Sequence, residues 1–365
     1  MKIVIAGGGT GGHLIPALTL AEALVALDSR VEPVMVGAQR GVEAFLLPQR
    51  PFRYHLLPLE PIYRKEWWKN LRWPVIAWKA LRACNRVLDS ERPVLALGTG
   101  GYASGPIMFQ ALRRGLPVAL LEQNAYPGVA TRWLVRRARQ IYLGFPEVAH
   151  HLTPGPTTKV HTFGNPVAPP PASAPDRSVA RQQFGIDPDA FVVLVMGGSQ
   201  GSLTINRTIA ELVSRGDFDD TVLLWSTGQT TWGDYRQHEA PPKRQLRAFW
   251  DPMSDAYAVA DLVIARAGAM TTAELCVWGL PAILIPLPTA AADHQAYNAG
   301  ALAAAGAAIH LPESRLSADT LGSAVADMLR SRNRLAEMGR AALARGRPEA
   351  AQRIARAPVS TIVRG

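Results

Sequence analysis

Short apolar runs alternate with amphipathic stretches along the first half of the chain. The runs at residues 2–6, 31–37, 94–97 and 118–121 predict strands, and the periodicity of residues 16–27 predicts a helix after the first of them. Strands that are apolar on both faces and separated by helices are typical of a parallel sheet covered on both sides. The first half therefore predicts an α/β domain with a parallel sheet.

The second half repeats this plan. Apolar runs at residues 191–196, 221–226, 261–265 and 282–286 predict four further strands, and the first of these again ends in glycines. Between the halves, residues 164–175 hold five prolines in twelve positions, which favours a stiff, exposed connection. We therefore expect a first domain at 1–163, a second at 164–346, and a short helical tail at 347–365 whose candidate packing partner is the first domain.

Length and composition agree with two globular domains. The chain has 365 residues, of which 48% are hydrophobic and 19% charged, and this balance excludes disordered, collagen-like and coiled-coil proteins. Two cysteines, Cys84 and Cys276, are too few for a disulfide framework or a four-ligand zinc site. The first residues lack the uninterrupted apolar stretch of a signal peptide, so no export is expected.

The positive charge is concentrated in one half. The net charge is +10, and residues 1–160 contain 20 basic and 10 acidic side chains whereas residues 161–365 contain 19 of each. The first domain is therefore expected to attract anions, which leaves nucleic acid, phosphates and an anionic membrane as partner classes.

A glycine-rich turn, GGGTGGH at residues 7–13, joins the first predicted strand to the first predicted helix. Backbone N–H groups at such a turn can approach an anion, and the helix dipole favours negative charge there. The pattern fits G-x-G-x-x-G, but a dinucleotide site also needs an acid at the end of the second strand, where Val36, Gly37 and Ala38 stand. A nicotinamide site is disfavoured. A merely tight turn is the alternative to an anion site.

Two more glycine turns follow predicted strands, GTGGYASGP at 98–106 and GGSQG at 197–201. Together the three turns suit a ligand that carries a diphosphate. The third also reads as G-x-S-x-G, so Ser199 could be a hydrolase nucleophile with Asp293 and either His294 or His310. That alternative would leave the other two turns without a purpose.

Several acids have two interpretations. Glu274, in the TTAE stretch at 271–274, could cap its own helix with Thr271 or bind the hydroxyls of a ribose. Asp187 and Asp189 resemble a metal-binding acid pair, but they precede a strand, whereas ligands in such folds bind beyond the strand C-termini. We interpret them as a turn, and we expect no metal or other cofactor.

Residues 63–86 contain four tryptophans, seven basic residues and one acid. Pro74 predicts two shorter helices in place of one. Tryptophan and basic side chains together suit a membrane interface, and the membrane-contact residues expected here are Lys65, Trp67, Trp68, Lys69, Arg72 and Trp73. A core helix with a solvated face and a stacking surface for single-stranded nucleic acid are the alternatives.

Five segments in the same order resemble glycosyltransferase family 28, the peptidoglycan N-acetylglucosaminyltransferases that convert lipid I to lipid II. They are HLIP at 13–16, GYASGP at 101–106, EQN at 122–124, GNPV at 164–167 and GGSQG at 197–201. The resemblance implies a GT-B fold, two Rossmann-like domains with parallel sheets facing a central cleft. UDP-GlcNAc would bind mainly to the second domain, and lipid I would approach the first.

The resemblance also implies site residues by position. The donor UDP-GlcNAc would be bound by Thr10, Gly11, Gly12, Asn124, Ser199, Gln200, Gly201, Trp250, Ala269, Met270, Thr271, Thr272, Glu274 and Gln295. The acceptor and its diphosphate would meet Gly9, Gly100, Gly101, Tyr102 and Ser104. Ala168 and Ala296 stand where the family usually has polar residues, which puts two donor contacts in doubt.

The implied reaction is an inverting transfer of GlcNAc to the C4 hydroxyl of the MurNAc sugar in lipid I. His13 is the first choice as the base and Glu122 the second, since imidazole titrates near neutrality. His13 could instead only bind a phosphate or its own loop. The implied partners are UDP-GlcNAc, lipid I, an anionic membrane surface and other cell-wall synthesis proteins, with no nucleic acid. The implied location is peripheral, on the cytoplasmic side of the inner membrane. Another GT-B glycolipid glycosyltransferase, a UDP-GlcNAc epimerase and a non-enzymatic adaptor remain alternatives.

Overall fold

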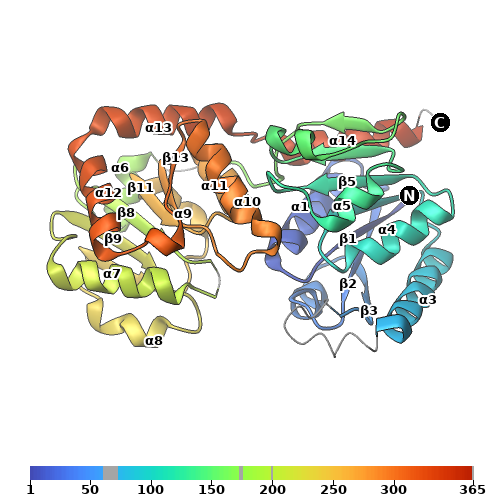
Figure 1. The fold of residues 1–365 in the computed structure, drawn as a ribbon, viewed down its shortest axis with the longest axis horizontal. Coiled ribbons are helices and arrows are strands. Elements are labelled where there is room, and N and C mark those ends of the chain that lie inside the picture. The colour runs from blue at the N-terminus through green and yellow to red at the C-terminus, as the bar shows by residue number, and fades with distance from the viewer. Residues whose placement is uncertain (61–72, 172–175, 199, 364–365) are drawn as a thin grey trace. The chain divides into compact units, whose positions relative to one another are not determined.

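The structure is a computed structural model that describes residues 1–60, 73–171, 176–198 and 200–363. It divides into two compact units, Met1–Val167 with Pro348–Gly365, and Ala168–Arg347 (Figure 1). Each unit is a parallel α/β sandwich, as the sequence predicts. The division follows Val167 and not residue 163, and the buried Asn165 donates a hydrogen bond to the Gln123 carbonyl of the first unit.

In the described part of the first unit, seven parallel strands lie in the order β3-β2-β1-β4-β5-β6-β7. The strands are β1 (Lys2–Gly7), β2 (Glu32–Ala38), β3 (Arg53–Leu57), β4 (Leu95–Gly100), β5 (Val118–Glu122), β6 (Gln140–Leu143) and β7 (Lys159–His161). The helices are α1 (Gly11–Leu27), α2 (Glu43–Leu46), α3 (Trp73–Glu91), α4 (Ser104–Arg113), α5 (Val129–Leu134) and α14 (Ala350–Val363).

Alternate residues of β1 face opposite layers of helices. Ile3 and Ile5 belong to the apolar cluster that contains α1 and α14, whereas Val4 and Ala6 belong to the cluster with α3 and α4. Successive strand side chains point to opposite faces, so a strand that is apolar throughout must be covered on both sides. This explains the continuous apolar run at the start of the chain.

The C-terminal helix α14 is part of the first unit. Ile354 is fully buried in the cluster that also contains Leu14 and Leu18 of α1, and the Arg353 guanidinium lies 4.4 Å from the ring centroid of Phe163. Figure 1 shows this last helix with the strands and helices of the first half. A helix of 14 residues gains most of its stability from such packing.

In the described part of the second unit, six parallel strands lie in the order β10-β9-β8-β11-β12-β13. The strands are β8 (Phe191–Met196), β9 (Thr221–Ser226), β10 (Arg244–Arg247), β11 (Leu262–Ala265), β12 (Ala282–Leu284) and β13 (Ala308–His310). The helices are α6 (Arg177–Gln183), α7 (Leu203–Arg215), α8 (Trp232–Tyr235), α9 (Met253–Val259), α10 (Ala269–Trp278), α11 (His294–Ala304), α12 (Ala318–Arg330) and α13 (Arg332–Arg345).

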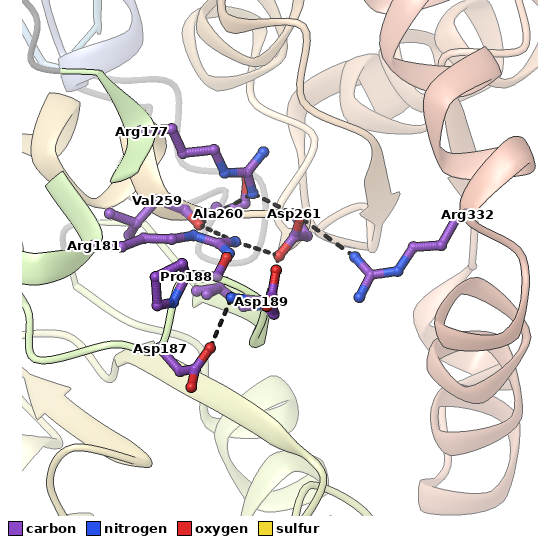
Figure 2. A network of polar contacts seen from close by, with 10 residues as sticks. Arg177, Arg181, Asp187, Pro188, Asp189, Val259, Ala260, Asp261 and Arg332 are labelled. Carbon is purple, nitrogen blue, oxygen red and sulfur yellow. Dashed lines mark hydrogen bonds and ion pairs between the residues drawn. The ribbon is translucent and has the colours of Figure 1, made fainter. Parts of the chain in front are cut away.

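Asp261 is the centre of a polar network at the amino-terminal edge of this second sheet. Its carboxylate accepts hydrogen bonds from Arg177 at 2.6 Å and Arg181 at 2.7 Å, and from the backbone N–H of Val192 at 2.8 Å. Figure 2 shows Arg332 of α13 reaching toward the same carboxylate. The network connects α6, the start of β8 and α13, so its role is to hold the unit together.

The two acids considered as a metal pair form a turn at this same edge, as expected. The N–H of Asp189 donates to Oδ1 of Asp187 at 2.8 Å, directly before β8. Among the described residues, no group of three or more acids, histidines and cysteines is arranged to hold a metal ion.

Two helix predictions need correction or restriction. Helix α1 begins at Gly11, five residues before the predicted start, so His13 stands in its first turn and Pro16 lies inside the helix. Helix α3 runs from Trp73 to Glu91, so Pro74 stands in its first turn, where proline is tolerated. This start agrees with the second of the two predicted helices. The other predicted helix lies outside the described residues. No helix in the described part of the chain has the length and apolar character of a membrane span.

Candidate functional site

The predicted glycine turns lie at the carboxyl ends of strands in both sheets. In the first unit, the turn after β1 and the turn after β4 are neighbours, because these two strands pair in the sheet. The chain moves outward in opposite directions from this pair, and such a switch point is where open parallel sheets bind ligands. The corresponding pair in the second unit is β8 and β11.

His13 lies between the two turns of the first unit. Its Nδ1 is 3.0 Å from the carbonyl oxygen of Thr99, and the Thr99 hydroxyl donates to the His13 carbonyl at 2.8 Å. A carbonyl can only accept, so Nδ1 carries the proton and the lone pair of the neutral ring is on Nε2. The sequence does not reveal this tautomer.

The third segment at this edge, EQN, follows β5. The Gln123 amide donates to the same Thr99 carbonyl. The Glu122 carboxylate is buried and accepts hydrogen bonds from the N–H groups of Asn124, at 3.2 Å, and Gly128, at 2.9 Å. Glu122 therefore fixes its own loop, and this geometry favours His13 over Glu122 as the base.

The predicted acceptor residues come together through close backbone contact. A Cβ atom on Gly101 would overlap the carbonyl oxygen of Gly8, and one on Gly9 would overlap the ring of Tyr102. Both glycines also have positive φ values, +75° and +89°. Much of the glycine content of these turns is thus explained by their contact with each other, an explanation that the sequence analysis did not consider.

Glu43 is a site residue that the sequence analysis missed. Its side chain is fully buried, and Oε1 accepts the N–H of Gly9 at 2.9 Å and the N–H of Ala38 at 2.9 Å. The sequence feature that could have pointed to Glu43 is an acid just beyond a predicted strand end, preceded by Gly37 and Gly41.

In the second unit, the turn after β8 leads into α7. Ser202 caps this helix by accepting the N–H of Ile205 at 3.4 Å, and Arg266 donates to the same hydroxyl at 2.7 Å. Arg266 also donates to the Pro286 carbonyl at 3.0 Å and pairs with Glu313. One guanidinium thus joins the turns after β8, β11 and β12, and the sequence analysis gave it no role. Ser199 lies outside the described residues.

Glu274 does not form the capping box considered above. Helix α10 begins at Ala269 with Gly268 as its N-cap, so Thr271 and Glu274 stand too far into the helix to cap it. The Glu274 carboxylate instead accepts the Tyr257 hydroxyl at 2.8 Å. Burial raises the pKa of Glu274, and the hydrogen bond from Tyr257 partly offsets this shift.

Trp250, Gln295 and the residues 269–272 lie on the same edge of the second sheet, whereas the expected donor residues Thr10, Gly11, Gly12 and Asn124 belong to the first unit. The side chain of Trp250 is buried between Phe184 and Arg247, and only 1% of the residue is exposed, so Trp250 offers almost no surface to the donor. Gln295 accepts the N–H of Leu287 at 3.0 Å and so orders the turn after β12. Ala269, Met270, Thr271 and Thr272 form the first turn of α10.

The side chains of the expected membrane contacts are outside the described part of the chain. Lys65, Trp67, Trp68, Lys69 and Arg72 lie outside the described residues, as does the side chain of Trp73.

Two family models match this chain. Residues 3–143 match the glycosyltransferase family 28 N-terminal domain, and residues 192–354 match the C-terminal domain of the same family. The chain belongs to glycosyltransferase family 28. Its family 28 relatives include a protein of Moorella thermoacetica, 37% identical over all of both chains, and one of Myxococcus xanthus, 39% identical over all of this chain and 94% of that protein. Both are UDP-N-acetylglucosamine--N-acetylmuramyl-(pentapeptide) pyrophosphoryl-undecaprenol N-acetylglucosamine transferases.

The solved structures agree with this family. The crystal structure of Acinetobacter baumannii MurG superposes with a TM-score of 0.78 at 26% identity, covering all of this chain and 99% of that one. The predicted fold class, two Rossmann-like domains of the GT-B type, is confirmed.

Proposed function

We propose that this protein transfers N-acetylglucosamine from UDP-GlcNAc to the C4 hydroxyl of the MurNAc sugar in undecaprenyl-diphosphate-linked MurNAc-pentapeptide, giving lipid II. The observation that carries the proposal is the match of the whole chain to family 28 transferases of that activity. The convergence of the segments GGGTGGH, GYASGP and EQN at one sheet edge supports it.

In the proposed mechanism, His13 is the general base. Nε2 accepts the proton of the acceptor hydroxyl while the oxygen of that hydroxyl forms a bond to the anomeric carbon of GlcNAc. The bond from that carbon to the UDP oxygen breaks, and UDP leaves with inversion. The Thr99 carbonyl supports this role, since it holds the proton on Nδ1 and stabilises the imidazolium that forms.

The donor diphosphate is assigned to the turn after β8. The N-terminus of α7, a helix of 13 residues, offers N–H groups and a favourable dipole to the charge that develops on the leaving phosphate. Arg266 holds Ser202 at this helix start. Glu274 accepts the ribose hydroxyls in this scheme, and Gln295 and Asn124 meet the sugar.

Peripheral membrane attachment through the first unit is part of the proposal. Large side chains exposed on this unit include Trp78 at 52%, Phe109 at 43% and Trp133 at 80%. Basic residues accompany them, with Arg82 over the ring of Trp78 at 3.7 Å and Arg113 next to Phe109. Aromatic rings beside basic side chains suit the headgroup region of an anionic bilayer.

The test is transfer of labelled GlcNAc from UDP-GlcNAc to a short-chain lipid I analogue, run with and without EDTA and beside a diacylglycerol acceptor. We expect product on the lipid I analogue alone, with no loss in EDTA. Transfer to diacylglycerol alone would contradict the acceptor assignment. Conversion of the free UDP-GlcNAc to its epimer would contradict transfer altogether.

A further inference from the structure

The buried Glu43 carboxylate lies against the first glycine turn, residues 7–13. In the described residues its hydrogen bonds come from backbone N–H groups, Gly9 to both oxygens at 2.9 and 3.0 Å and Ala38 to Oε1 at 2.9 Å. The side chain has no exposed surface. Carboxylate bonds to backbone N–H are among the stronger hydrogen bonds of proteins, and a buried carboxylate needs them.

Three glycines leave the space that this side chain fills. A Cβ atom on Gly8 or Gly41 would overlap the carboxylate, and one on Gly37 would overlap its Cγ. Gly8 lies in the turn after β1, Gly37 at the end of β2 and Gly41 just before α2. The sequence around the first turn is therefore built to admit a carboxylate.

This arrangement determines which N–H groups of the turn remain for a ligand. The N–H of Gly9 is directed at Glu43, whereas Gly11 and Gly12 precede the first hydrogen bond of α1, made by His13 to the Thr10 carbonyl. The first N–H groups of a helix have no partner within it. A second anion at Gly9 would also be repelled by the Glu43 carboxylate.

We infer that Glu43 is a positioning residue for the acceptor reaction: it holds the Gly8–Gly9 backbone in place, so that the start of α1 presents Gly11, Gly12 and His13 to the acceptor. This inference moves Gly11 and Gly12 from the expected donor set to the acceptor site. The inference rests on the proposed function, because it assigns the acceptor to this turn. Glu43 touches neither substrate in this scheme and acts through the backbone of the turn.

The test compares Glu43→Gln with Glu91→Gln in the full-length protein. Glu91 is the matched control, a buried acid of the same unit that pairs with Lys2 at 2.9 Å and His55 at 2.8 Å at the opposite, amino-terminal edge of the sheet. Steady-state kinetics are measured for both substrates. Hydrogen–deuterium exchange is measured on the peptide that spans residues 7–13.

For Glu43→Gln we expect kcat/KM for the lipid I analogue to fall about tenfold or more, since small displacements of a reacting group have large effects on rate. The KM for UDP-GlcNAc should stay the same, and residues 7–13 should exchange faster. Glu43→Asp, which keeps the charge on a shorter side chain, should recover part of the loss. Glu91→Gln should lower the melting temperature and change neither the kinetics nor the exchange of this peptide.

If Glu43→Gln behaved like Glu91→Gln, Glu43 would be only a stabilising residue and the inference would be overturned. Equal loss of UDP-GlcNAc and lipid I affinity would overturn it as well. If the wild type failed to use lipid I while Glu43→Gln still loosened residues 7–13, the proposed function would fail and the positioning of the turn would be supported.

Discussion

The two units place glycine turns at equivalent points of similar sheets, but the charged group behind each turn differs. Behind the first turn is the Glu43 carboxylate, which accepts backbone N–H groups. In the second unit, the group behind the turn after β8 is the Arg266 guanidinium. It donates to the Ser202 hydroxyl and the Pro286 carbonyl and is neutralised by Glu313.

This difference gives the two turns different electrostatic surroundings. The Glu43 carboxylate beside Gly9 would repel a diphosphate at the first turn. This argues against the expected contact of Gly9 with the acceptor diphosphate and equally against a donor diphosphate there. The neutral Arg266–Glu313 pair adds no such repulsion at the second turn. The contrast supports the proposal that the donor diphosphate binds to the second unit.

The largest expected effect is at His13, which has no counterpart among the assigned residues of the second unit. His13→Ala should lower kcat by about 100- to 10,000-fold, since it removes a general base, and should leave the affinity for UDP-GlcNAc unchanged by calorimetry. His13→Asn is the control, because its amide can still donate to Thr99 but cannot accept the proton. Near-normal turnover of His13→Asn would show that His13 only holds its loop.

The next largest effect is expected at Ile354, where a substitution tests whether the stability of the first unit depends on the C-terminal helix. Ile354→Ala should lower the free energy of unfolding by about 2–5 kcal/mol, because it leaves a cavity in the core shared with α1. Leu343→Ala is the control, since this side chain on α13 is 56% exposed and its loss should cost much less. Denaturant titration with both variants measures the difference. Equal midpoints would contradict the packing of α14.

A smaller effect is expected at Glu274 in the second unit. Glu274→Gln should weaken UDP-GlcNAc binding about tenfold, because a charged acceptor for the ribose hydroxyls is lost. The pKa of Glu274 is raised by burial, so protonation begins at a higher pH than for an ordinary glutamate. The Kd of the wild type should therefore increase as the pH falls through this raised pKa, while the Kd of Glu274→Gln should stay constant. A wild-type Kd without pH dependence would exclude Glu274 from the ribose site.

The smallest effect concerns the membrane, which only the first unit is proposed to contact. Replacing Lys65, Trp67, Trp68 and Lys69 together, or Trp78 and Trp133 together, should reduce binding to phosphatidylglycerol vesicles by several-fold. High salt should weaken the wild type similarly. Phe45→Ala is the control, since Phe45 is 72% exposed on α2. Unchanged vesicle sedimentation of both multiple variants would contradict the attachment.

The central strands could be predicted because their signal is local. The apolar runs at 191–196 and 221–226 coincide with β8 and β9, since strands buried on both faces are apolar throughout. The apolar runs do not predict β3, β6, β7, β10 and β13. Of these, β7 (KVH) and β10 (RQLR) are short and polar. These segments form strands because their backbone N–H and C=O groups pair with those of a neighbouring strand.

The candidate site was predicted to a similar extent. The glycine turns, His13 and Glu274 are visible as residues that follow strands. Their partners are not visible, because Thr99 is 86 residues from His13 and Gly9 is 34 residues from Glu43. Of the two roles considered for Glu274, the cap is excluded because α10 begins at Ala269, and the start of a helix depends on which backbone groups find partners.

The sequence by itself determined two parallel α/β halves, the glycine turns at their strand ends and the family, since each depends on periodicity or on short ordered segments. Only the tertiary structure decided the tautomer of His13, the Glu43 carboxylate behind the first turn, the Tyr257 partner of Glu274 and the return of α14 to the first unit. These four depend on hydrogen bonds and apolar contacts between segments separated along the chain, and no local pattern encodes such contacts.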